Sequence, residues 1–247
     1  MKLSILLKQD FRNIFGNPSV LLFAFLYPTA LVLLFGSLFS DMYQSELVTS
    51  FDFYGITMIF YLILQSATIT PTIFMEERIK KGNLRIAYAP VSRVEIYASK
   101  LIATIILLAS SFLVHIGFLG IFKIVNFGGP NCLAIIGLFF LVLVFMVSLG
   151  GAVCTIVKNE DLTNKIVGIT VNCFALVSGI FFPVETLGEF ASRVANATPV
   201  KMTLNKIFEI IYDNSFDGIG WVIGFTILFT ILMIFIIHRH YHIEDYI

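Results

Sequence analysis

The feature that most constrains this chain is a series of long runs without a charged residue. One of these runs, 132–157, holds no Asp, Glu, Lys or Arg over 26 residues. An α-helix rises about 1.5 Å per residue, so about 20 apolar residues cross the hydrocarbon core of a bilayer. Because runs of this kind recur along the chain, the sequence predicts an all-α integral membrane protein.

Composition supports this class. Hydrophobic residues make up 58% of the 247 positions and charged residues only 13%, against about 25% charged in a typical soluble domain. The formal net charge is zero, so bulk charge argues neither for nor against a nucleic-acid partner, and we expect none. Cys132, Cys154 and Cys173 all lie in apolar runs and form no C-x-x-C pair. We therefore expect neither a disulfide framework nor a metal site.

We expect six transmembrane helices, at residues 19–39, 53–75, 101–122, 132–157, 166–182 and 219–237.

The segments around these spans have patterns of their own. Residues 1–17 place apolar side chains at helical spacing and keep Lys8, Asp10 and Arg12 off that stripe, which predicts an amphipathic interfacial helix. Pro28 is expected to kink the first span.

Two further segments are expected at or outside the membrane surface. Residues 158–165 are expected to form a tight charged turn. Residues 183–218 contain Thr186-x-x-Glu189, which has the form of a capping box, and then apolar residues at helical spacing. They predict a pair of amphipathic or re-entrant helices between the fifth and sixth spans.

The segment 76–100 is the longest strongly charged stretch, with six of the sixteen Lys and Arg residues. Ser92-x-x-Glu95 within it also has the form of a capping box, which predicts that the next helix starts outside the membrane. Placing both termini, 76–100 and 158–165 in the cytoplasm puts twelve basic residues inside and four outside. The positive-inside tendency therefore predicts a multi-pass protein with both termini cytoplasmic. We expect the membrane to be a bacterial-type cell (plasma) membrane.

The sequence offers little material for catalysis. It contains no G-x-x-x-x-G-K-[ST], H-E-x-x-H or G-x-S-x-G motif, and the apolar spans carry no acidic residue. His115 is the one ionisable group other than Cys and Tyr inside a span. We therefore expect no catalytic, cofactor or metal site in this chain, and any energy for transport should come from a partner.

Three motifs recur in a recognisable order: E-x-x-x-x-x-G-N-L and A-P-V-S-R in the charged segment, and S-G-I-F-F-P at the end of the fifth span. Together they resemble the pattern of the permease subunits of the ABC type 2 transporter family. The matching positions are Glu76, Gly82, Leu84, Pro90, Ser92, Arg93, Lys100, Ser178, Gly179, Pro183 and Pro199. The resemblance covers nearly the whole chain; Asn83 stands where many members have Thr, and Ala89 where many have Ser.

The resemblance implies that segment 76–100 includes a coupling helix that docks on a separate ATPase subunit, which binds ATP and Mg²⁺. It also implies two permeases, identical or homologous, and two ATPases per transporter. The expected coupling residues are Glu76, Glu77, Arg78, Lys80, Lys81, Gly82, Leu84, Arg85 and Pro90. The alternative is that the basic residues among them serve only as positive-inside anchors and that Gly82 and Pro90 only form turns.

Polar residues inside the spans have two interpretations. Gln65, Thr68, Thr70 and Asn172 either line a translocation path or hold neighbouring helices together. His115 either contacts substrate or bonds a neighbouring helix.

Segment 183–218, which this orientation places on the extracytoplasmic side, has two interpretations as well. The resemblance implies an extracellular gate, and the alternative is an interfacial support. The gate would include Ser178, Gly179, Pro183, Leu187, Phe190 and Pro199. The histidines at 238, 240 and 242 bind metal or belong to a tail at headgroup level.

These observations predict the membrane-spanning, non-enzymatic subunit of an ATP-driven exporter. Its substrate is expected to be hydrophobic or amphipathic, such as a drug, a peptide antibiotic or a lipid-linked molecule. One alternative is a membrane anchor or immunity protein that binds a peptide at the bilayer. A second is an ion-coupled carrier or channel, which the absence of intramembrane carboxylates disfavours.

Overall fold

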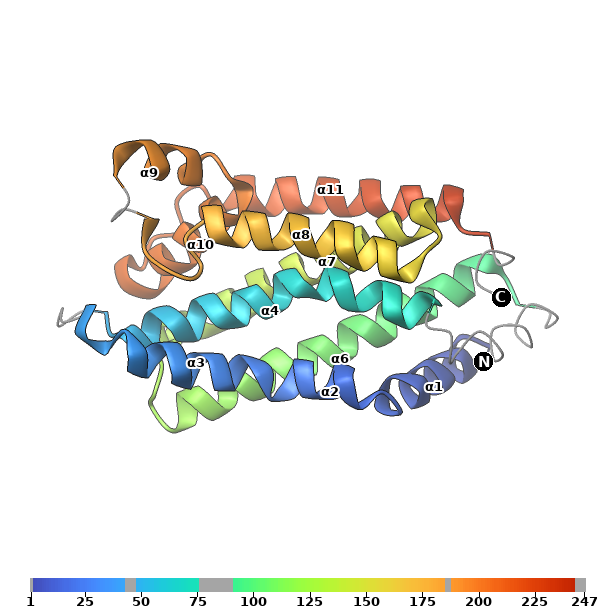
Figure 1. The fold of residues 1–247 in the computed structure, drawn as a ribbon, viewed down its shortest axis with the longest axis horizontal. Coiled ribbons are helices and arrows are strands. Elements are labelled where there is room, and N and C mark those ends of the chain that lie inside the picture. The colour runs from blue at the N-terminus through green and yellow to red at the C-terminus, as the bar shows by residue number, and fades with distance from the viewer. Residues whose placement is uncertain (1, 43–47, 76–90, 185–187, 243–247) are drawn as a thin grey trace.

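The computed structural model describes residues 2–42, 48–75, 91–184 and 188–242, and all regular structure within these ranges is helical. The elements are α1 (Lys2–Phe15), α2 (Pro18–Phe25), α3 (Tyr27–Leu38), η1 (Ser40–Met42), α4 (Ser50–Met75), α6 (Arg93–Ile121), η2 (Gly129–Asn131), α7 (Cys132–Val157), α8 (Glu160–Val177), α9 (Glu189–Asn196), α10 (Pro199–Phe208), η4 (Glu209–Asp213) and α11 (Ile219–His240). The long helices run along one axis (Figure 1). We call the end that carries α9 and α10 the hairpin end, and the end where α4 stops and α6 begins the loop end.

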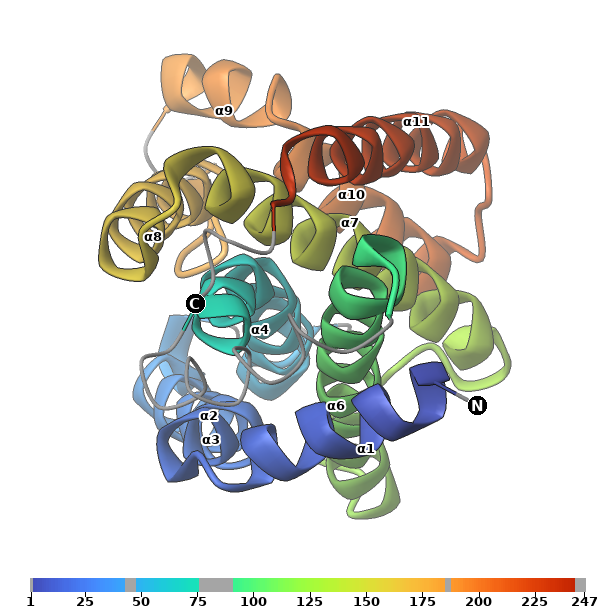
Figure 2. The ribbon, with the colours of Figure 1, turned by 90° about the vertical axis from the view of Figure 1, so that its right-hand side faces the viewer.

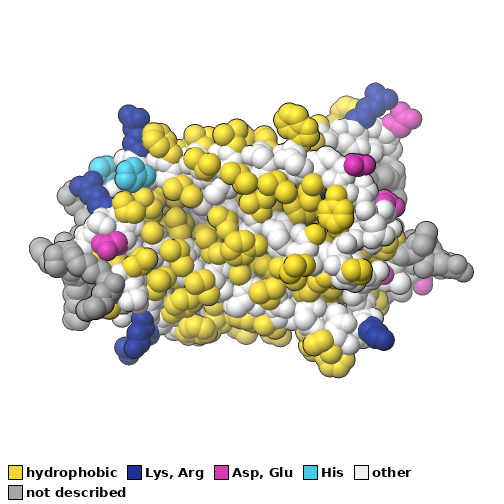
Figure 3. Space-filling model, turned by 180° about the vertical axis from the view of Figure 1, so that it is seen from behind, with side chains coloured by type: hydrophobic (Ala, Val, Ile, Leu, Met, Phe, Trp, Pro, Cys, Tyr) yellow, Lys and Arg dark blue, Asp and Glu magenta, His cyan; other side chains and the backbone are white. Residues whose placement is uncertain are grey.

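Within the described residues, five helical stretches are long and apolar enough to cross a membrane: Pro18–Leu38, Ser50–Met75, Arg93–Ile121, Gly129–Val157 and Ile219–His240. Hydrophobic side chains cover the middle of the face in Figure 3, and charged side chains lie toward its two ends. This distribution fits a bilayer around the middle of the bundle.

The expected fifth span is α8, which has different bounds from those predicted. It begins at Glu160, because the Asn159 side chain accepts a hydrogen bond from the Leu162 backbone N–H and caps the helix. The expectation of a turn over 158–165 was therefore wrong, since six of those residues are helical. Charges at 160, 161 and 165 fall in the first two turns of α8, and its crossing of the membrane stays a prediction.

The first span is broken as its proline suggested. α2 stops at Phe25 and α3 starts at Tyr27, with Pro28 in its first turn. The Leu26 N–H still bonds to the Leu22 oxygen at 3.0 Å, so the chain bends without losing its direction.

At the centre of the bundle lies α4 (Figure 2), flanked by α3, α6, α7 and α8. Its most apolar 18-residue window is 89% buried, whereas the corresponding windows of the other four candidate spans are 17–50% buried. Close packing against α7 depends on Gly150, where a Cβ atom would lie 2.2 Å from the backbone oxygen of Ala67. Small residues allow membrane helices this close approach.

Helix α1 crosses the bundle at the loop end and packs on α6 (Figure 2). Leu6, Asp10 and Ile14, spaced four residues apart, form its buried side. Asp10 was expected off the apolar stripe, and this was wrong: its exposed fraction is 4%.

Candidate functional site

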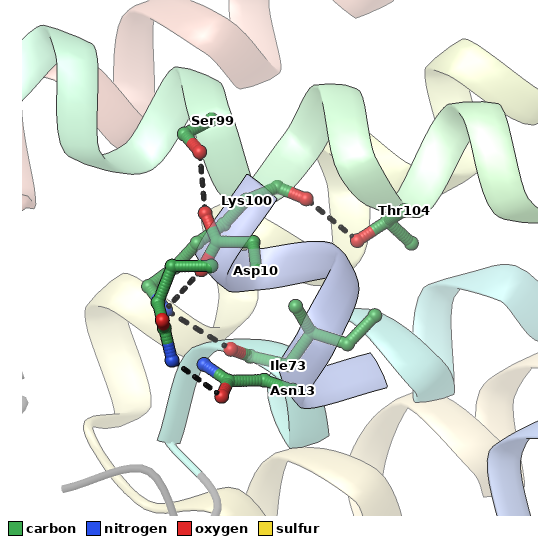
Figure 4. A network of polar contacts seen from close by, with 7 residues as sticks. Asp10, Asn13, Ile73, Ser99, Lys100 and Thr104 are labelled. Carbon is green, nitrogen blue, oxygen red and sulfur yellow. Dashed lines mark hydrogen bonds and ion pairs between the residues drawn. The ribbon is translucent and has the colours of Figure 1, made fainter. Parts of the chain in front are cut away.

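Three helices meet at the loop end in a buried polar junction formed by Asp10, Ile73, Ser99 and Lys100 (Figure 4). The Lys100 Nζ lies 3.3 Å from the Asp10 Oδ1 and donates to the backbone oxygen of Ile73, also at 3.3 Å. The Ser99 hydroxyl donates to the second oxygen of Asp10. The junction therefore joins α1, the last turn of α4 and the beginning of α6.

Burial gives this ion pair its importance. The Lys100 and Asp10 side chains are only 2% and 6% exposed, so neither charge is well solvated by water. A buried charge is tolerated where an opposite charge and further hydrogen bonds compensate for lost hydration, and here both oxygens of Asp10 have partners. Removing either partner would leave a buried charge unpaired.

The junction flanks the segment for which the coupling role was predicted. That segment follows Met75 in α4 and leads to Val91, just before α6. All nine predicted coupling residues, Glu76, Glu77, Arg78, Lys80, Lys81, Gly82, Leu84, Arg85 and Pro90, lie outside the described residues. After them, the predicted capping box is confirmed: the Ser92 hydroxyl accepts from the Glu95 N–H, and the Glu95 carboxylate accepts from the Ser92 N–H.

The end of α11 packs against the same region. The ring of Tyr241, 2% exposed, contacts the rings of Phe74 and Tyr97 at centroid distances of 6.3 and 5.5 Å. Burial, and then the nearby Asp10 carboxylate, raise the pKa of Tyr241, so its phenol stays neutral. The C-terminal side of the described chain thus supports both helices that flank segment 76–90.

The histidines near this end have separate partners. His238 lies 3.2 Å from the Tyr97 hydroxyl, His240 3.1 Å from the Ile236 oxygen, and His242 3.4 Å from the Arg93 guanidinium. This arrangement does not gather the three rings around a common metal position.

Halfway along the bundle, the structure brings together two of the predicted path residues. The Gln65 side-chain amide donates to the Asn172 Oδ1 at 2.9 Å and to the Tyr61 hydroxyl at 2.6 Å. The Tyr61 hydroxyl in turn donates to the Asn172 Oδ1 at 2.7 Å. We call Tyr61, Gln65 and Asn172 the polar cluster; it links α4 to α8, and Asn172 is exposed at the surface of the chain.

The other predicted path residues do not join the polar cluster through side-chain bonds. The Thr68 and Thr70 hydroxyls donate to backbone oxygens of their own helix, at Gln65 and Ser66. His115 on α6 is 1% exposed, and its Nε2 has no hydrogen-bond partner among the described residues. Tyr61 was missed by sequence reasoning, although its position four residues before Gln65 places both on one helix face.

The predicted gate residues that are described lie near the turns around α9 and α10. The Ser178 hydroxyl, at the end of α8, lies 2.8 Å from that of Thr198, which caps α10 just before Pro199. Gly179 adopts a φ of +74°, and a Cβ atom there would lie 2.3 Å from a methyl group of Val184. Gly179 therefore permits the turn after α8, and Thr198 with Pro199 forms the N-terminal cap of α10. Pro183 is half-buried, Phe190 on α9 is 81% exposed, and Leu187 lies outside the described residues.

Helix α4 also contacts the hairpin end. The Tyr54 hydroxyl donates to the Phe181 oxygen at 3.0 Å, and the Phe53 and Phe208 rings stack at 5.7 Å. Tyr61 contacts the Phe181 ring edge to face at 5.1 Å. A single helix therefore touches the junction, the polar cluster and the segments around α9 and α10.

The helical fold, the candidate spans and the apolar band define a multi-pass membrane protein. The ABC-2 type transporter family matches residues 1–212. The chain therefore belongs to this family, as the motifs suggested, and is a permease component of an ABC transporter. A comparison with curated proteins gave no match.

Proposed function

We propose that this chain is the membrane-spanning subunit of an ATP-driven exporter. In this proposal it moves a hydrophobic or amphipathic compound outward and takes its energy from a separate ATPase subunit, which binds ATP and Mg²⁺. Two permease chains, identical or homologous, form the transporter with two ATPases. The expected localisation is a bacterial-type cell membrane with both termini cytoplasmic.

The observation that carries the proposal is the position of α4. Its last turn accepts a hydrogen bond from Lys100 beside segment 76–90, its middle holds Gln65, and its first turns contact Phe181 and Phe208. A force on segment 76–90 would act directly on one end of this helix. The hydrogen bonds and ring contacts supply a route by which its tilt alters the polar cluster and the hairpin end.

The predicted path and gate fit into this scheme as follows. We propose that Asn172, with Gln65 buried behind it, faces the path at the surface between α4 and α8, and that α9 and α10 cover its extracytoplasmic exit. Thr68, Thr70 and His115 support the helices around it. Exposed apolar side chains on α9, such as Phe190 and Val194, would lie in the outer membrane surface.

The first experiment is to purify the full chain in mild detergent from its native membrane and identify its partners by mass spectrometry. An ATP-binding subunit should be recovered, and replacing residues 76–82 should abolish its recovery while the folded permease remains. Recovery of the chain alone, without nucleotide-dependent activity, would favour the anchor or ion-coupled alternatives.

A second experiment tests the direction of transport. Inverted vesicles that contain the purified complex should accumulate a fluorescent hydrophobic cation on addition of ATP and Mg²⁺. Accumulation that depends on an ion gradient and does not require ATP would contradict the proposal.

A further inference from the structure

A pocket of about 540 Å³ opens at the hairpin end, away from the junction and the polar cluster. Thr49 and Asp52 line it at the start of α4, Ile116 and Gly120 at the end of α6, and Lys123 and Asn126 in the loop that leads to α7. Its volume is in the range of pockets that hold small ligands. Its lining combines apolar side chains with one acidic and one basic group.

The acidic group is held in place by neutral donors. One oxygen of Asp52 accepts hydrogen bonds from the Thr49 N–H at 3.1 Å and hydroxyl at 2.7 Å, and the other accepts from the Asn126 N–H at 2.6 Å. Asp52 is 8% exposed, and no Lys, Arg or His of the described residues lies within 4.0 Å of its carboxylate. The carboxylate is thus fixed at the pocket wall without a cation beside it, and an ammonium group is its natural ligand.

A second observation shows the influence of this charge. The Tyr212 ring in η4 is partly buried, and its hydroxyl has no hydrogen-bond partner among the described residues. Burial, and then the nearby Asp52 carboxylate, raise the pKa of Tyr212. The phenol therefore stays neutral and adds no second negative charge at this end of α4.

The basic group lies in the loop around the pocket. Lys123 is exposed and has a φ of +52°, an uncommon conformation for a residue with a side chain. A turn in which its N–H bonds to the Gly120 oxygen at 3.0 Å holds this conformation. Lys123 forms no ion pair with the described residues. The pocket can therefore receive a ligand that carries both an ammonium and an anionic group.

Apolar side chains beside the pocket indicate the rest of that ligand. Ile121 and Phe122, next to Lys123, are 80% and 63% exposed, and Leu133, next to Cys132 of the lining, is 79% exposed. In a membrane, side chains this exposed and this apolar face lipid. A ligand seated in the pocket would therefore have its non-polar part at the surface of the bilayer.

We propose that this pocket binds the headgroup of a phospholipid that carries a primary ammonium, the phosphoethanolamine type. Asp52 accepts the ammonium N–H donors, Lys123 pairs with the phosphate, and the acyl chains extend along Ile121, Phe122 and Leu133. The proposal rests on the pocket and does not depend on transport.

The test is native mass spectrometry of the full chain, released from nanodiscs that contain equal amounts of phosphatidylethanolamine, phosphatidylcholine and phosphatidylglycerol. Phosphatidylcholine keeps the phosphate but has no ammonium N–H, and phosphatidylglycerol has no ammonium. We expect phosphatidylethanolamine to be retained about tenfold over either, the ratio expected for one charge-assisted hydrogen bond. Equal retention of all three would overturn the proposal.

Two variants assign the binding to this pocket. Asp52→Asn should abolish the preference for phosphatidylethanolamine over phosphatidylcholine. Lys123→Gln, an exposed change that leaves folding intact, should lower retention of both lipids several-fold. Lys158→Gln is the matched control, because Lys158 is exposed, has a φ of +56° and lies at the loop end. A Lys123→Gln variant that retains both lipids as the control does would contradict the proposal even if Asp52→Asn does not fold.

A competition distinguishes a lipid from a free headgroup. Soluble phosphoethanolamine at the concentration of the lipid should leave retention of phosphatidylethanolamine unchanged, because it lacks the acyl chains. Full displacement would overturn the lipid assignment.

Discussion

Asp10 and Lys100 are 90 residues apart in the sequence, and their side chains meet at 3.3 Å inside the protein, where water has almost no access. This contact fixes the N-terminal helix to the beginning of α6. Because Lys100 also bonds to the Ile73 oxygen, the contact reaches the end of α4.

Replacing one partner of this pair should be costly. Asp10→Asn or Lys100→Met leaves a buried charge unpaired, which typically costs about 3–5 kcal/mol of folding stability. The double variant should lose much less than the sum, because no unpaired charge remains. The unfolding free energies of the wild type, the two single variants and the double variant form a double-mutant cycle. They would be measured by titrating SDS into the protein in a mild detergent.

The exposed pair Glu189–Arg193 provides a control for that cycle, with side chains 89% and 79% exposed. Its equivalent variants, Glu189→Gln and Arg193→Met, should change stability little, since solvent screens such pairs. Additive effects of the Asp10 and Lys100 variants would show that the buried pair is not energetically coupled.

Adding one methyl group at Gly150 should push α4 and α7 apart. The new Cβ atom in Gly150→Ala would lie 2.2 Å from the Ala67 oxygen, so the backbone must move. Overpacking of this kind costs about 1–3 kcal/mol. Gly137→Ala on the same helix meets no atom within 4 Å and should retain wild-type stability in the same titration. Equal stability of both variants would contradict the close packing.

A substitution in the polar cluster can show whether its residues line a translocation path or hold α4 and α8 together. Gln65→Leu removes the amide that bonds Tyr61 and Asn172 but keeps a similar volume. If the cluster lines the path, transport should fall several-fold while stability falls by no more than about 1 kcal/mol, the usual range for one bond between membrane helices.

Thr170→Val on α8 is the control for the cluster, because the Thr170 hydroxyl is exposed and, among the described residues, bonds only to the Ile166 oxygen of its own helix. A Gln65→Leu protein that is markedly unstable, yet transports normally per folded molecule, would indicate helix support instead.

Charge removal in segment 76–90 should uncouple transport. The double substitution Glu77→Ala with Arg78→Ala is expected to leave the chain folded but to abolish ATP-dependent transport. Vesicle transport and the detergent melting temperature would be compared with those of Lys165→Ala, an exposed residue at the same end. Wild-type transport by the double variant would count against the coupling role.

Local features were predictable from the sequence because their causes are local. The capping box of Ser92 and Glu95 and the break before Pro28 each depend on residues within one turn. The start of α8 could have been found in the same way, since Asn159 followed by Glu160 and Asp161 is a typical helix N-terminus.

The interior position of Asp10 could not be predicted in this way. An apolar-stripe analysis assigns a charged residue to solvent, yet Leu6, Asp10 and Ile14 share the buried side of α1. What makes burial acceptable is Lys100, which lies far away in the sequence and is itself buried. The same reasoning holds for Tyr61, whose partner Asn172 lies on another helix.

The burial of α4 has a consequence for biosynthesis. This helix has the lowest mean hydropathy of the five candidate spans, 1.5 against 2.1–3.0, and carries its polar groups where α7 and α8 will later cover them. During translation it emerges before either of those helices exists, so it is the segment least able to stay in lipid alone. Chains that stop before Val177 therefore leave Gln65 without its partner Asn172, and they should be more exposed to quality-control proteases than the full chain, which makes completion of α8 the step that secures α4.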